Sequence, residues 1–258
     1  MTRVALVTGA ARGIGAATVR ALAADGWAVV ATDRCADDPR LPYGLGTREE
    51  LDALAAETGA LAVVADTCDG AALGAAVAVA EERFGGLDAV LAVAGVVAGG
   101  VPLWEQPEEQ VRAVLEVDLG GVVTAARVGV PALLRRPAPR SGRFVAVASA
   151  AATRGLPQLA AYCAAKAGVT GLVRGLAAEL AGTGVTANAV SPGSTETRVL
   201  DESARLYRLE SAHDFASQQP LGRLVDPAEV AAAIVWLAGA GSGAVTGATL
   251  AVDGGLSL

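Results

Sequence analysis

The sequence predicts an α/β protein with a doubly wound, seven-stranded parallel sheet flanked by helices. Two observations predict this fold. Short apolar runs rich in β-branched residues alternate with longer segments of helical character that are rich in Ala, Leu, Glu and Arg. The runs are also continuously apolar, as expected of parallel strands that helical crossovers cover on both faces. The expected strands are Val4–Val7, Trp27–Thr32, Leu61–Val64, Leu87–Val93, Phe144–Ala148, Val185–Val190 and Ala248–Val252.

The chain is expected to form one domain, residues 1–258, because α/β folds of this length often share a single core and no Pro/Ser-rich linker divides it. Two segments interrupt the alternation. Residues 34–47 carry two prolines and two glycines. Since such connections usually take roughly 2 to 6 residues, an insertion is predicted there. Residues 197–219 have the apolar spacing of a helical lid over a substrate site, although the same spacing fits plain packing on the domain.

Composition and charge argue against several classes of partner. The net charge of −7 opposes attraction to nucleic acid, and no basic stripe with interleaved aromatic residues is present. No uncharged apolar run reaches the roughly 18 residues that cross a bilayer. The segment Met1–Val7 lacks the sections of a signal peptide, so a cytoplasmic protein is expected. The three cysteines are far apart and lack metal-ligand spacing, which indicates reduced thiols and no metal site.

A glycine-rich segment, Thr8 to Gly15, follows the first expected strand and opens a helix. Gly9 permits a tight turn, Gly13 lets the backbone approach a pyrophosphate, and Gly15 allows the helix to pack closely on the strand. The amino end of the helix then presents free N–H groups and a positive dipole to the anion. This arrangement predicts a dinucleotide site of Rossmann type, whereas glycines after a strand can also mark an ordinary turn.

Asp33 ends the second expected strand, about 20 residues beyond the glycines. A carboxylate there accepts hydrogen bonds from both ribose hydroxyls of the adenosine and repels a 2′-phosphate, which favours NAD over NADP. Two alternatives stay open. Asp33 could be a loop residue, and the adjacent Arg34 could meet a phosphate and reverse the preference.

Tyr162 and Lys166 stand four residues apart in an apparent helix, a spacing that places both side chains on one face. A phenol with a pKa of about 10 is a poor base at neutral pH, but a neighbouring ammonium and a nicotinium ring stabilise the phenolate. Ser149 ends the preceding strand, at the carboxyl edge where open α/β sheets bind ligands, and could hydrogen-bond a carbonyl oxygen. Alone, the Tyr/Lys pair would be an ordinary amphipathic face. Combined with the glycine motif, these residues predict hydride-transfer chemistry.

From Thr8 to Gly255 the sequence resembles the short-chain dehydrogenase/reductase family. Ser149, Tyr162 and Lys166 match its catalytic triad, and Val252–Gly255 matches its carboxyl-terminal signature. The resemblance implies that Tyr162 is the general acid/base and that Ser149 positions the substrate oxygen. It implies that Lys166 binds the nicotinamide ribose and lowers the pKa of Tyr162.

The same resemblance implies a set of cofactor-binding positions. Asp66 and Thr67 are implied to neighbour the adenine, with an ordinary strand-end turn as the alternative. The segment from Pro192 to Thr197 is implied to hold the carboxamide. The full set is Gly9, Arg12, Gly13, Ile14, Gly15, Asp33, Asp66, Thr67, Ala94, Gly95, Tyr162, Lys166, Pro192, Gly193, Thr195 and Thr197.

Two positions depart from the family pattern. Residues 92–95 read Ala-Val-Ala-Gly where the family has Asn-Asn-Ala-Gly, which is expected to cost structural hydrogen bonds rather than chemistry. Asp118 replaces the Asn that often completes a catalytic tetrad. If Asp118 approaches Lys166 through a water, its charge partly cancels the pull of the ammonium on the Tyr162 phenolate, and an alkaline optimum for oxidation follows. The alternative is that Asp118 is an ordinary polar residue of a helix.

Residues 35–43 of the insertion resemble the carveol-dehydrogenase-like, mycofactocin-associated branch of the family. This resemblance implies that the insertion covers the cofactor, that NAD(H) exchanges slowly, and that electrons leave to an external redox carrier. A solvated loop without consequence is the alternative.

These observations predict an enzyme, an NAD-dependent short-chain alcohol dehydrogenase or ketoreductase acting on a hydrophobic secondary alcohol or ketone. A nicotinamide-binding regulator without turnover, and an epimerase or dehydratase that uses bound NAD, are the alternatives. Family members commonly pair through long helices, which here correspond to about Pro107 to Leu134 and Leu159 to Ala181. A homodimer or homotetramer is therefore expected.

Overall fold

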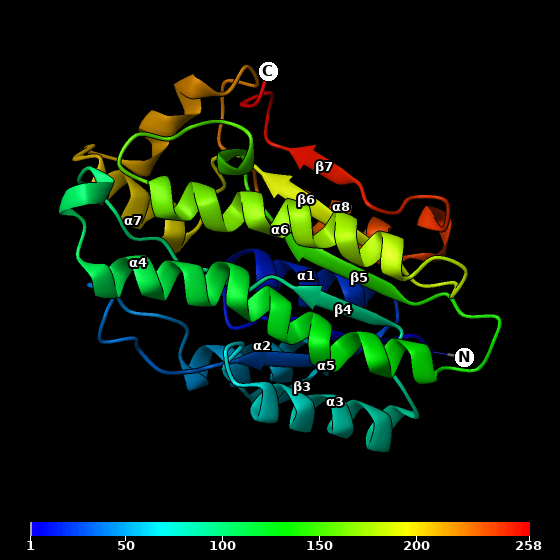
Figure 1. Cartoon of the computed structure of the whole chain (residues 1–258). Helices are drawn as coiled ribbons and strands as arrows, with labels where there is room; N and C mark the ends of the chain where they lie inside the picture. The colour runs from blue at the N-terminus through cyan, green and yellow to red at the C-terminus, as the bar shows by residue number, and fades with distance from the viewer. Residues whose placement is uncertain (1) are drawn as a thin grey trace.

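The computed structural model describes residues 2–258 and has a seven-stranded sheet at its centre (Figure 1). The strand order is β3-β2-β1-β4-β5-β6-β7, and every neighbouring pair is parallel. The predicted fold class is confirmed, and each strand end shifts by two residues at most. The strands are β1 Val4–Thr8, β2 Ala28–Asp33, β3 Leu61–Val64, β4 Ala89–Ala92, β5 Arg143–Val147, β6 Thr186–Pro192 and β7 Thr249–Val252.

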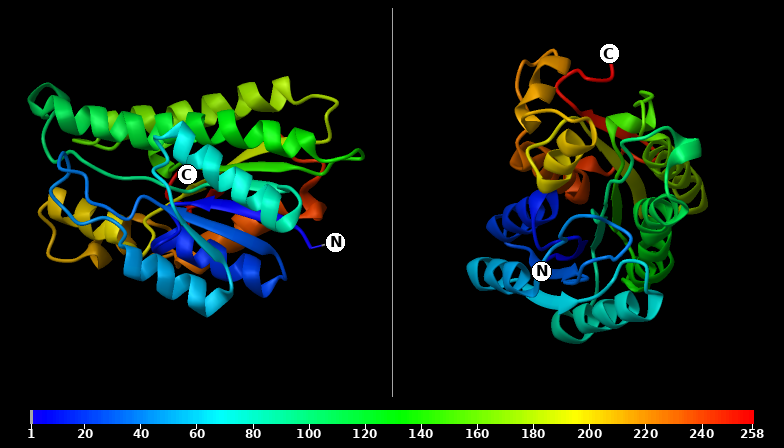
Figure 2. Two further views of the ribbon diagram at one scale, coloured as in Figure 1. Left: turned by 90° about the horizontal axis from the view of Figure 1, so that it is seen from below. Right: turned by 90° about the vertical axis from the view of Figure 1, so that its left-hand side faces the viewer.

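Helices cover both faces of the sheet, as the two further views show (Figure 2). The eight α-helices are α1 Gly13–Ala24, α2 Arg48–Thr58, α3 Gly70–Phe84, α4 Glu108–Leu115, α5 Gly121–Arg135, α6 Ala160–Glu179, α7 Arg198–Leu206 and α8 Pro227–Ala238. Val4 and Leu6 of β1 pack in the core beneath α3, α5 and α6, whereas Ala5 and Val7 pack beneath α1, α2 and α8. Alternate residues of one strand thus face the two helical layers, which explains the continuous apolar runs.

Three irregular segments lie near the carboxyl ends of the strands. Residues 34–47 form neither helix nor strand and lead into α2, whose first turn is closed by a capping box between Thr47 and Glu50. A π-helical segment, Glu116–Gly120, separates α4 from α5. Beyond β6, α7 is followed by a short 3₁₀ segment, Ala212–Gln218, and their apolar residues form a separate small core.

Within the described part of the chain, one helical stretch, Glu108–Arg135, is long and apolar enough to span a membrane by length and composition. Half of its most apolar window is buried in the protein. Val122, Ala125 and Leu133 of this stretch pack in the core, where α5 contacts α3 and β4. Packing on the sheet therefore accounts for its apolar character.

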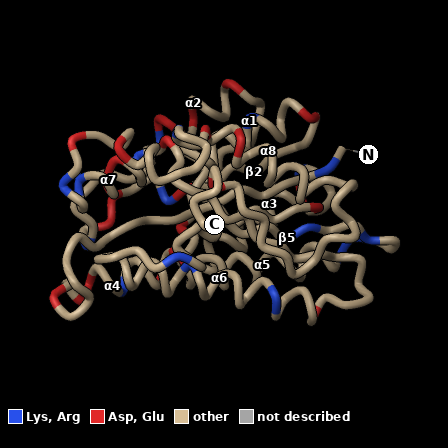
Figure 3. The backbone as a smooth tube through the Cα atoms, turned by 90° about the horizontal axis from the view of Figure 1, so that it is seen from above, with Lys and Arg blue, Asp and Glu red and all other residues tan. Residues whose placement is uncertain are grey.

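Charged residues of both signs surround the end of the molecule toward which the strands point. Figure 3 shows basic and acidic residues interspersed there, near α4 and α7. Because α/β sheets bind ligands beyond the carboxyl ends of their strands, this end is where the site is expected.

Candidate active site

A cavity of about 580 Å³ lies at the carboxyl ends of the strands. It is lined by residues that directly follow β1 to β6, drawn from segments far apart in the sequence. Every residue that the sequence predicted for the site lines it. These residues are Gly9, Arg12, Gly13, Ile14, Gly15, Asp33, Asp66, Thr67, Ala94, Gly95, Asp118, Ser149, Tyr162, Lys166, Pro192, Gly193, Thr195 and Thr197.

The glycine motif forms an open cradle at the start of α1. Gly9 has φ +65°, and a Cβ there would lie 2.6 Å from the Cα of Ala94. A Cβ on Gly15 would lie 2.0 Å from the carbonyl oxygen of Gly9, so side chains at both positions would collide with backbone. Gly13, at φ +57°, faces Thr197 from the other wall. The cradle leaves backbone N–H groups of the helix start free for an anion, and the residues present therefore fit a dinucleotide.

Asp33 ends β2 beside this cradle. Its Oδ2 accepts a hydrogen bond from the Ala11 N–H at 3.1 Å, and its Oδ1 accepts one from the Cys35 N–H at 3.3 Å. Arg34 turns away to other carboxylates: its Nη1 lies 3.2 Å from Asp38 Oδ2, and its Nε lies 3.7 Å from Asp66 Oδ2. The Arg34 guanidinium is thus already paired, whereas Asp33 makes only backbone hydrogen bonds.

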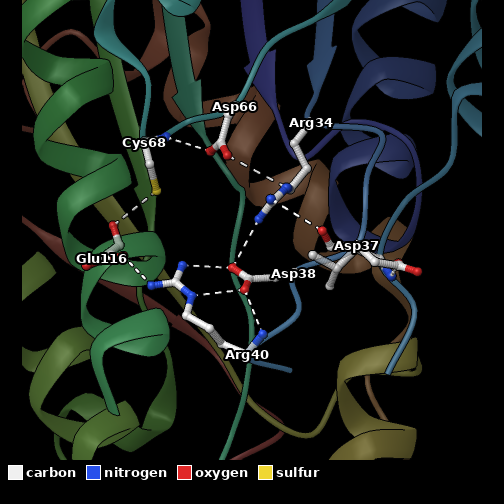
Figure 4. A network of polar contacts seen from close by, with 8 residues as sticks. Arg34, Asp37, Asp38, Arg40, Asp66, Cys68 and Glu116 are labelled. Carbon is white, nitrogen blue, oxygen red and sulfur yellow. Dashed lines mark hydrogen bonds and ion pairs between the residues drawn. The ribbon is translucent and has the colours of Figure 1, made fainter. Parts of the chain in front are cut away.

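The insertion, residues 34–47, is fastened by a network of ion pairs around Asp38 (Figure 4). Arg34 and Arg40 approach Asp38 from opposite sides, with Arg40 Nη2 at 2.8 Å from Oδ2. Arg40 Nη1 also lies 2.5 Å from Oε2 of Glu116, which joins the insertion to the π-helical segment. The hydrogen bond from Arg40 holds the pKa of Asp38 well below its usual range. We call this group of ion pairs, from Arg34 through Asp38 and Arg40 to Glu116, the insertion clamp.

The tip of the insertion reaches the cavity itself. Tyr43, Leu45 and Gly46 line it, and Arg12 of the glycine motif donates from Nη2 to the Gly44 carbonyl oxygen at 2.6 Å. The Tyr43 hydroxyl accepts a hydrogen bond from the Val97 N–H at 2.9 Å, and burial raises its pKa. The insertion was predictable from the sequence but these side chains were not, because only the fold shows which of them turn inward.

Tyr162 and Lys166 lie in the first two turns of α6, and their side chains face the cavity. Lys166 is buried and donates from Nζ to the Val147 carbonyl oxygen at 3.2 Å. Its Nζ lies 5.6 Å from the centre of the Tyr162 ring. Ser149 follows β5 and begins a short 3₁₀ turn that packs against α6, and its hydroxyl caps this turn by accepting from the Ala151 N–H.

Asp118 contacts Lys166 directly rather than through a water, which corrects the expectation from the sequence. Its Oδ1 lies 3.0 Å from Lys166 Nζ and accepts a hydrogen bond from the Val96 N–H at 3.2 Å. Two features bring the carboxylate inward. The π-helical segment that carries Asp118 turns it toward α6, and Gly95 leaves room, since a Cβ there would lie 2.6 Å from Asp118 Oδ1. The second oxygen, Oδ2, is buried and has no hydrogen-bond partner among the described residues.

Burial dominates the proton affinity of Tyr162. Desolvation raises its pKa and Asp118 raises it further, while Lys166 and a side-chain interaction with Ser149 lower it, and the net shift is upward. Lys166 does pull in the predicted direction, but it is outweighed. Burial alone would lower the pKa of Lys166, yet the attraction of Asp118 and Tyr162 raises it above its usual value. The ammonium is therefore held charged beside the phenol.

The remaining part of the cavity, which we call the lid end, lies between α7 and the loop that follows Ser149. The predicted lid residues Leu200, Tyr207 and Phe215 line it, and the Tyr207 hydroxyl donates to the Pro157 carbonyl oxygen at 2.6 Å. Arg154 lines the same end. In the sequence Arg154 stood out only as a charge within an apolar stretch, so its place in the site was missed.

Comparison with known proteins gives the family. The sequence profile of a family described as enoyl-(acyl carrier protein) reductase matches residues 9–257. The cis-4-hydroxycyclohexanecarboxylate dehydrogenase of Sinomonas cyclohexanicum is 41% identical over 98% of this chain and 96% of its own length. The 2-dehydro-3-deoxy-L-rhamnonate dehydrogenase (NAD(+)) of Sphingomonas sp. (strain SKA58) is 35% identical, covering 98% of this chain and 94% of that protein.

A solved structure agrees with this relationship. Carveol dehydrogenase from Mycobacterium avium, in complex with NAD, superposes with a TM-score of 0.91 at 32% sequence identity, over 98% of this chain and 97% of that one. The family profile matches almost the whole chain, dehydrogenases match it over 98% of its length, and the fold agrees with a solved member. The chain therefore belongs to the short-chain dehydrogenase/reductase family.

Proposed function

We propose that the protein transfers a hydride between NAD(H) and a secondary alcohol or ketone, with Tyr162 as general acid/base. One observation carries the proposal. The partly buried Tyr162, the buried Lys166 and the Ser149 hydroxyl line the same cavity as the glycine cradle. The relative from Sinomonas cyclohexanicum is named for a cyclic secondary alcohol, which favours a cyclic alcohol for this chain as well.

In this proposal NAD, when bound, supplies the hydride acceptor. The Ser149 hydroxyl donates a hydrogen bond to the substrate oxygen and holds it toward Tyr162. The Tyr162 phenolate accepts the alcohol proton as the carbonyl forms, and in the reverse direction the phenol returns it. Lys166 stabilises the phenolate through its charge and would also hold the nicotinamide ribose, since its Nζ donates only to Val147 and Asp118 in the described structure.

Asp118 acts in this scheme through Lys166. Because Asp118 raises the pKa of Tyr162, a smaller fraction of the base is ionised at neutral pH, and oxidation is expected to favour alkaline conditions. Asp118 also keeps Lys166 protonated in that range, since it raises the pKa of the ammonium.

The preference for NAD over NADP is proposed on two contacts. Asp33 presents a carboxylate at the end of β2, where it would accept from the ribose hydroxyls and repel a 2′-phosphate. Arg34 is engaged by Asp38 and Asp66 and is not free to meet that phosphate. The relative from Sphingomonas, named for NAD(+), supports the same choice.

We further propose that the insertion covers the cofactor and slows its exchange, as in the mycofactocin-associated branch, so that electrons leave to an external carrier. Tyr43 and Gly46 line the cavity, and the insertion clamp joins this segment to the helix beyond it. The structural similarity to carveol dehydrogenase from Mycobacterium avium is the reason for comparing the chain with that branch.

The test is to purify the protein without added cofactor and to measure NAD(H) released by denaturation. Rapid turnover of added NAD by protein that holds none would exclude slow exchange. The same preparation decides between the wider functions, using a panel of cyclic secondary alcohols. Formation of NADH and ketone supports the dehydrogenase. An epimerised or dehydrated product without net NADH supports the epimerase or dehydratase. If no product forms, a nicotinamide-binding regulator is supported instead.

Self-association is proposed from exposed apolar residues on two separate parts of the surface. Trp104 is 85% exposed beside α4, which lies against α6. Trp236 of α8 and Leu250 of the edge strand β7 are also exposed. Two such surfaces would make a homotetramer, with light scattering as the test. We propose that residues 1–258 act as one cytoplasmic domain with residues 197–219 as its lid.

A further inference from the structure

We propose that the lid end of the cavity binds a carboxylate carried by the substrate, and that Arg154 recognises it. This inference rests on the proposed alcohol dehydrogenase function and narrows its substrate class. The substrate would be a hydroxy or oxo acid whose apolar body separates the reacting carbon from the carboxylate.

Charged residues of both signs line the cavity. Three of the lining cations already have a partner. Arg12 donates to the Gly44 carbonyl oxygen, and Lys166 pairs with Asp118. Arg34 pairs with Asp38 and Asp66 beside Asp33, in the part of the cavity where the adenosine is expected, which we call the adenosine end. The lining carboxylates are Asp33, Asp66 and Asp118. None of them belongs to the lid end.

Arg198 and Arg154 are the remaining lining cations, and their places differ. Arg198 begins α7 directly after Thr197, and a Cβ on Gly13 would lie 3.3 Å from Thr197 Cγ2. Arg198 therefore stands next to the glycine cradle, where the pyrophosphate of a dinucleotide provides its counter-charge. Arg154 stands on the loop that follows Ser149, on the substrate side of the catalytic residues.

The Arg154 side chain is held in place but not neutralised. Its Nη1 donates to the Leu256 carbonyl oxygen at 2.8 Å, which ties it to the carboxyl-terminal segment. Across residues 2–258, neither Nε nor Nη2 of Arg154 makes a hydrogen bond, and no carboxylate lies within ion-pair distance of it. A guanidinium with a free N–H edge suits a planar carboxylate, which it can bind through two parallel hydrogen bonds.

Arg154 is exposed to solvent and shares the lid end with apolar side chains. Leu156, Leu200, Phe215 and Leu256 line the same end of the cavity. These side chains suit the hydrocarbon body of a substrate, and they offer no competing acceptor for the guanidinium. An uncharged hydrophobic alcohol would gain nothing from the free N–H edge of Arg154, whereas a carboxylate would pair with it, so the edge would favour the acid.

The kinetic test compares 4-hydroxycyclohexanecarboxylate with its methyl ester, which keeps the alcohol and removes the charge. Arg154→Gln is expected to lower kcat/KM for the acid about 10- to 100-fold and to leave the ester nearly unchanged. Arg154→Lys should retain part of the preference for the acid. Arg83→Gln, at an exposed position near the end of α3, is the matched control and should leave kcat/KM unchanged for both the acid and the ester.

A binding measurement keeps this inference separate from the proposed function. Calorimetry of the NAD-loaded protein with cyclohexanecarboxylate and with the corresponding carboxamide needs no turnover. Tighter binding of the acid that is lost in Arg154→Gln supports the carboxylate site even if no alcohol is oxidised. Oxidation of the ester as fast as the acid, or equal loss of both in Arg154→Gln, would overturn the carboxylate site and leave the dehydrogenase intact.

Discussion

Ion pairs stabilise two parts of the cavity: the catalytic end, around Tyr162 and Lys166, and the adenosine end, around Asp33. The surroundings of these ion pairs differ. At the catalytic end, the side chains of Lys166 and Asp118 are 4% and 0% exposed. At the adenosine end, the insertion clamp combines a buried Asp38 carboxylate, 2% exposed, with a wetter outer pair, in which Arg40 is 30% and Glu116 56% exposed. An ion pair can therefore have a different effect at the catalytic end than at the adenosine end.

The difference follows from how water screens charge. Between buried groups, a charge a few ångströms away changes proton affinity strongly, so Asp118 can adjust Lys166 and Tyr162. Between exposed groups the attraction is weak and partly offset by the loss of side-chain freedom. The catalytic pair is thus suited to setting the pKa of Tyr162, and the outer pair of the insertion clamp, Arg40–Glu116, to holding a loop with modest strength.

The largest effect is expected at the catalytic end, from Tyr162→Phe. This change removes the hydroxyl that exchanges a proton with the substrate, and kcat is expected to fall about 10³-fold. NADH binding should stay within a few-fold of wild type, because the ring is retained. Stopped-flow kinetics and cofactor titration measure the two quantities, and substantial remaining turnover would assign the proton transfer to another group.

At the adenosine end, Asp33→Ala is expected to have a smaller but selective effect. Loss of a carboxylate that accepts from the ribose hydroxyls should lower kcat/KM for NAD about 10- to 100-fold. Activity with NADP should hold or rise, because the repulsion of its 2′-phosphate is removed as well. Steady-state kinetics with both cofactors test this, and equal losses would refute the assignment.

Asp118→Asn is expected to shift the pH dependence of oxidation, which tests the effect of the buried pair at the catalytic end. Asp118 raises the pKa of both Tyr162 and Lys166, so its neutral replacement should let both groups lose protons at lower pH. Because oxidation needs the phenolate, the rising limb of kcat/KM against pH should move down by about one unit.

The matched control is Asp66→Asn, the same chemical change at the adenosine end. It should alter the KM for NAD and leave the pH profile in place. If the pH profile of kcat/KM does not move in Asp118→Asn, or moves equally in Asp66→Asn, Asp118 has no specific effect on the pKa of Tyr162.

Much of this arrangement follows from local sequence, and the rest depends on contacts between distant segments. The strands were predictable because parallel strands buried on both faces must be apolar, and Tyr162 and Lys166 share a face because of helical spacing. The direct contact between Asp118 and Lys166 was not predictable, since it requires the π-helical segment and the space beside Gly95. The free edge of Arg154 was equally hidden, because its surroundings come from the lid and the carboxyl-terminal segment.

The smallest effect is expected from opening the insertion clamp with Arg40→Gln. This removes the contacts of Arg40 with Asp38 and Glu116 while leaving the cavity lining intact. A pair as exposed as Arg40–Glu116 contributes about 0.2–1 kcal/mol, and the buried Asp38 keeps its ion pair with Arg34 in this variant. If the insertion slows cofactor exchange, NADH should dissociate up to about 5-fold faster, and kcat should change little unless release limits it.

Arg20→Gln is the control for this change, because it breaks an exposed pair with Glu57 between α1 and α2, away from the cavity. Release of NADH should be unaffected there. Faster release in Arg40→Gln alone would mean that weak, solvent-exposed ion pairs can still govern how long a cofactor stays bound. Equal release rates in both variants and the wild type would mean that Tyr43 and its buried contact with Val97 hold the insertion without help from the clamp.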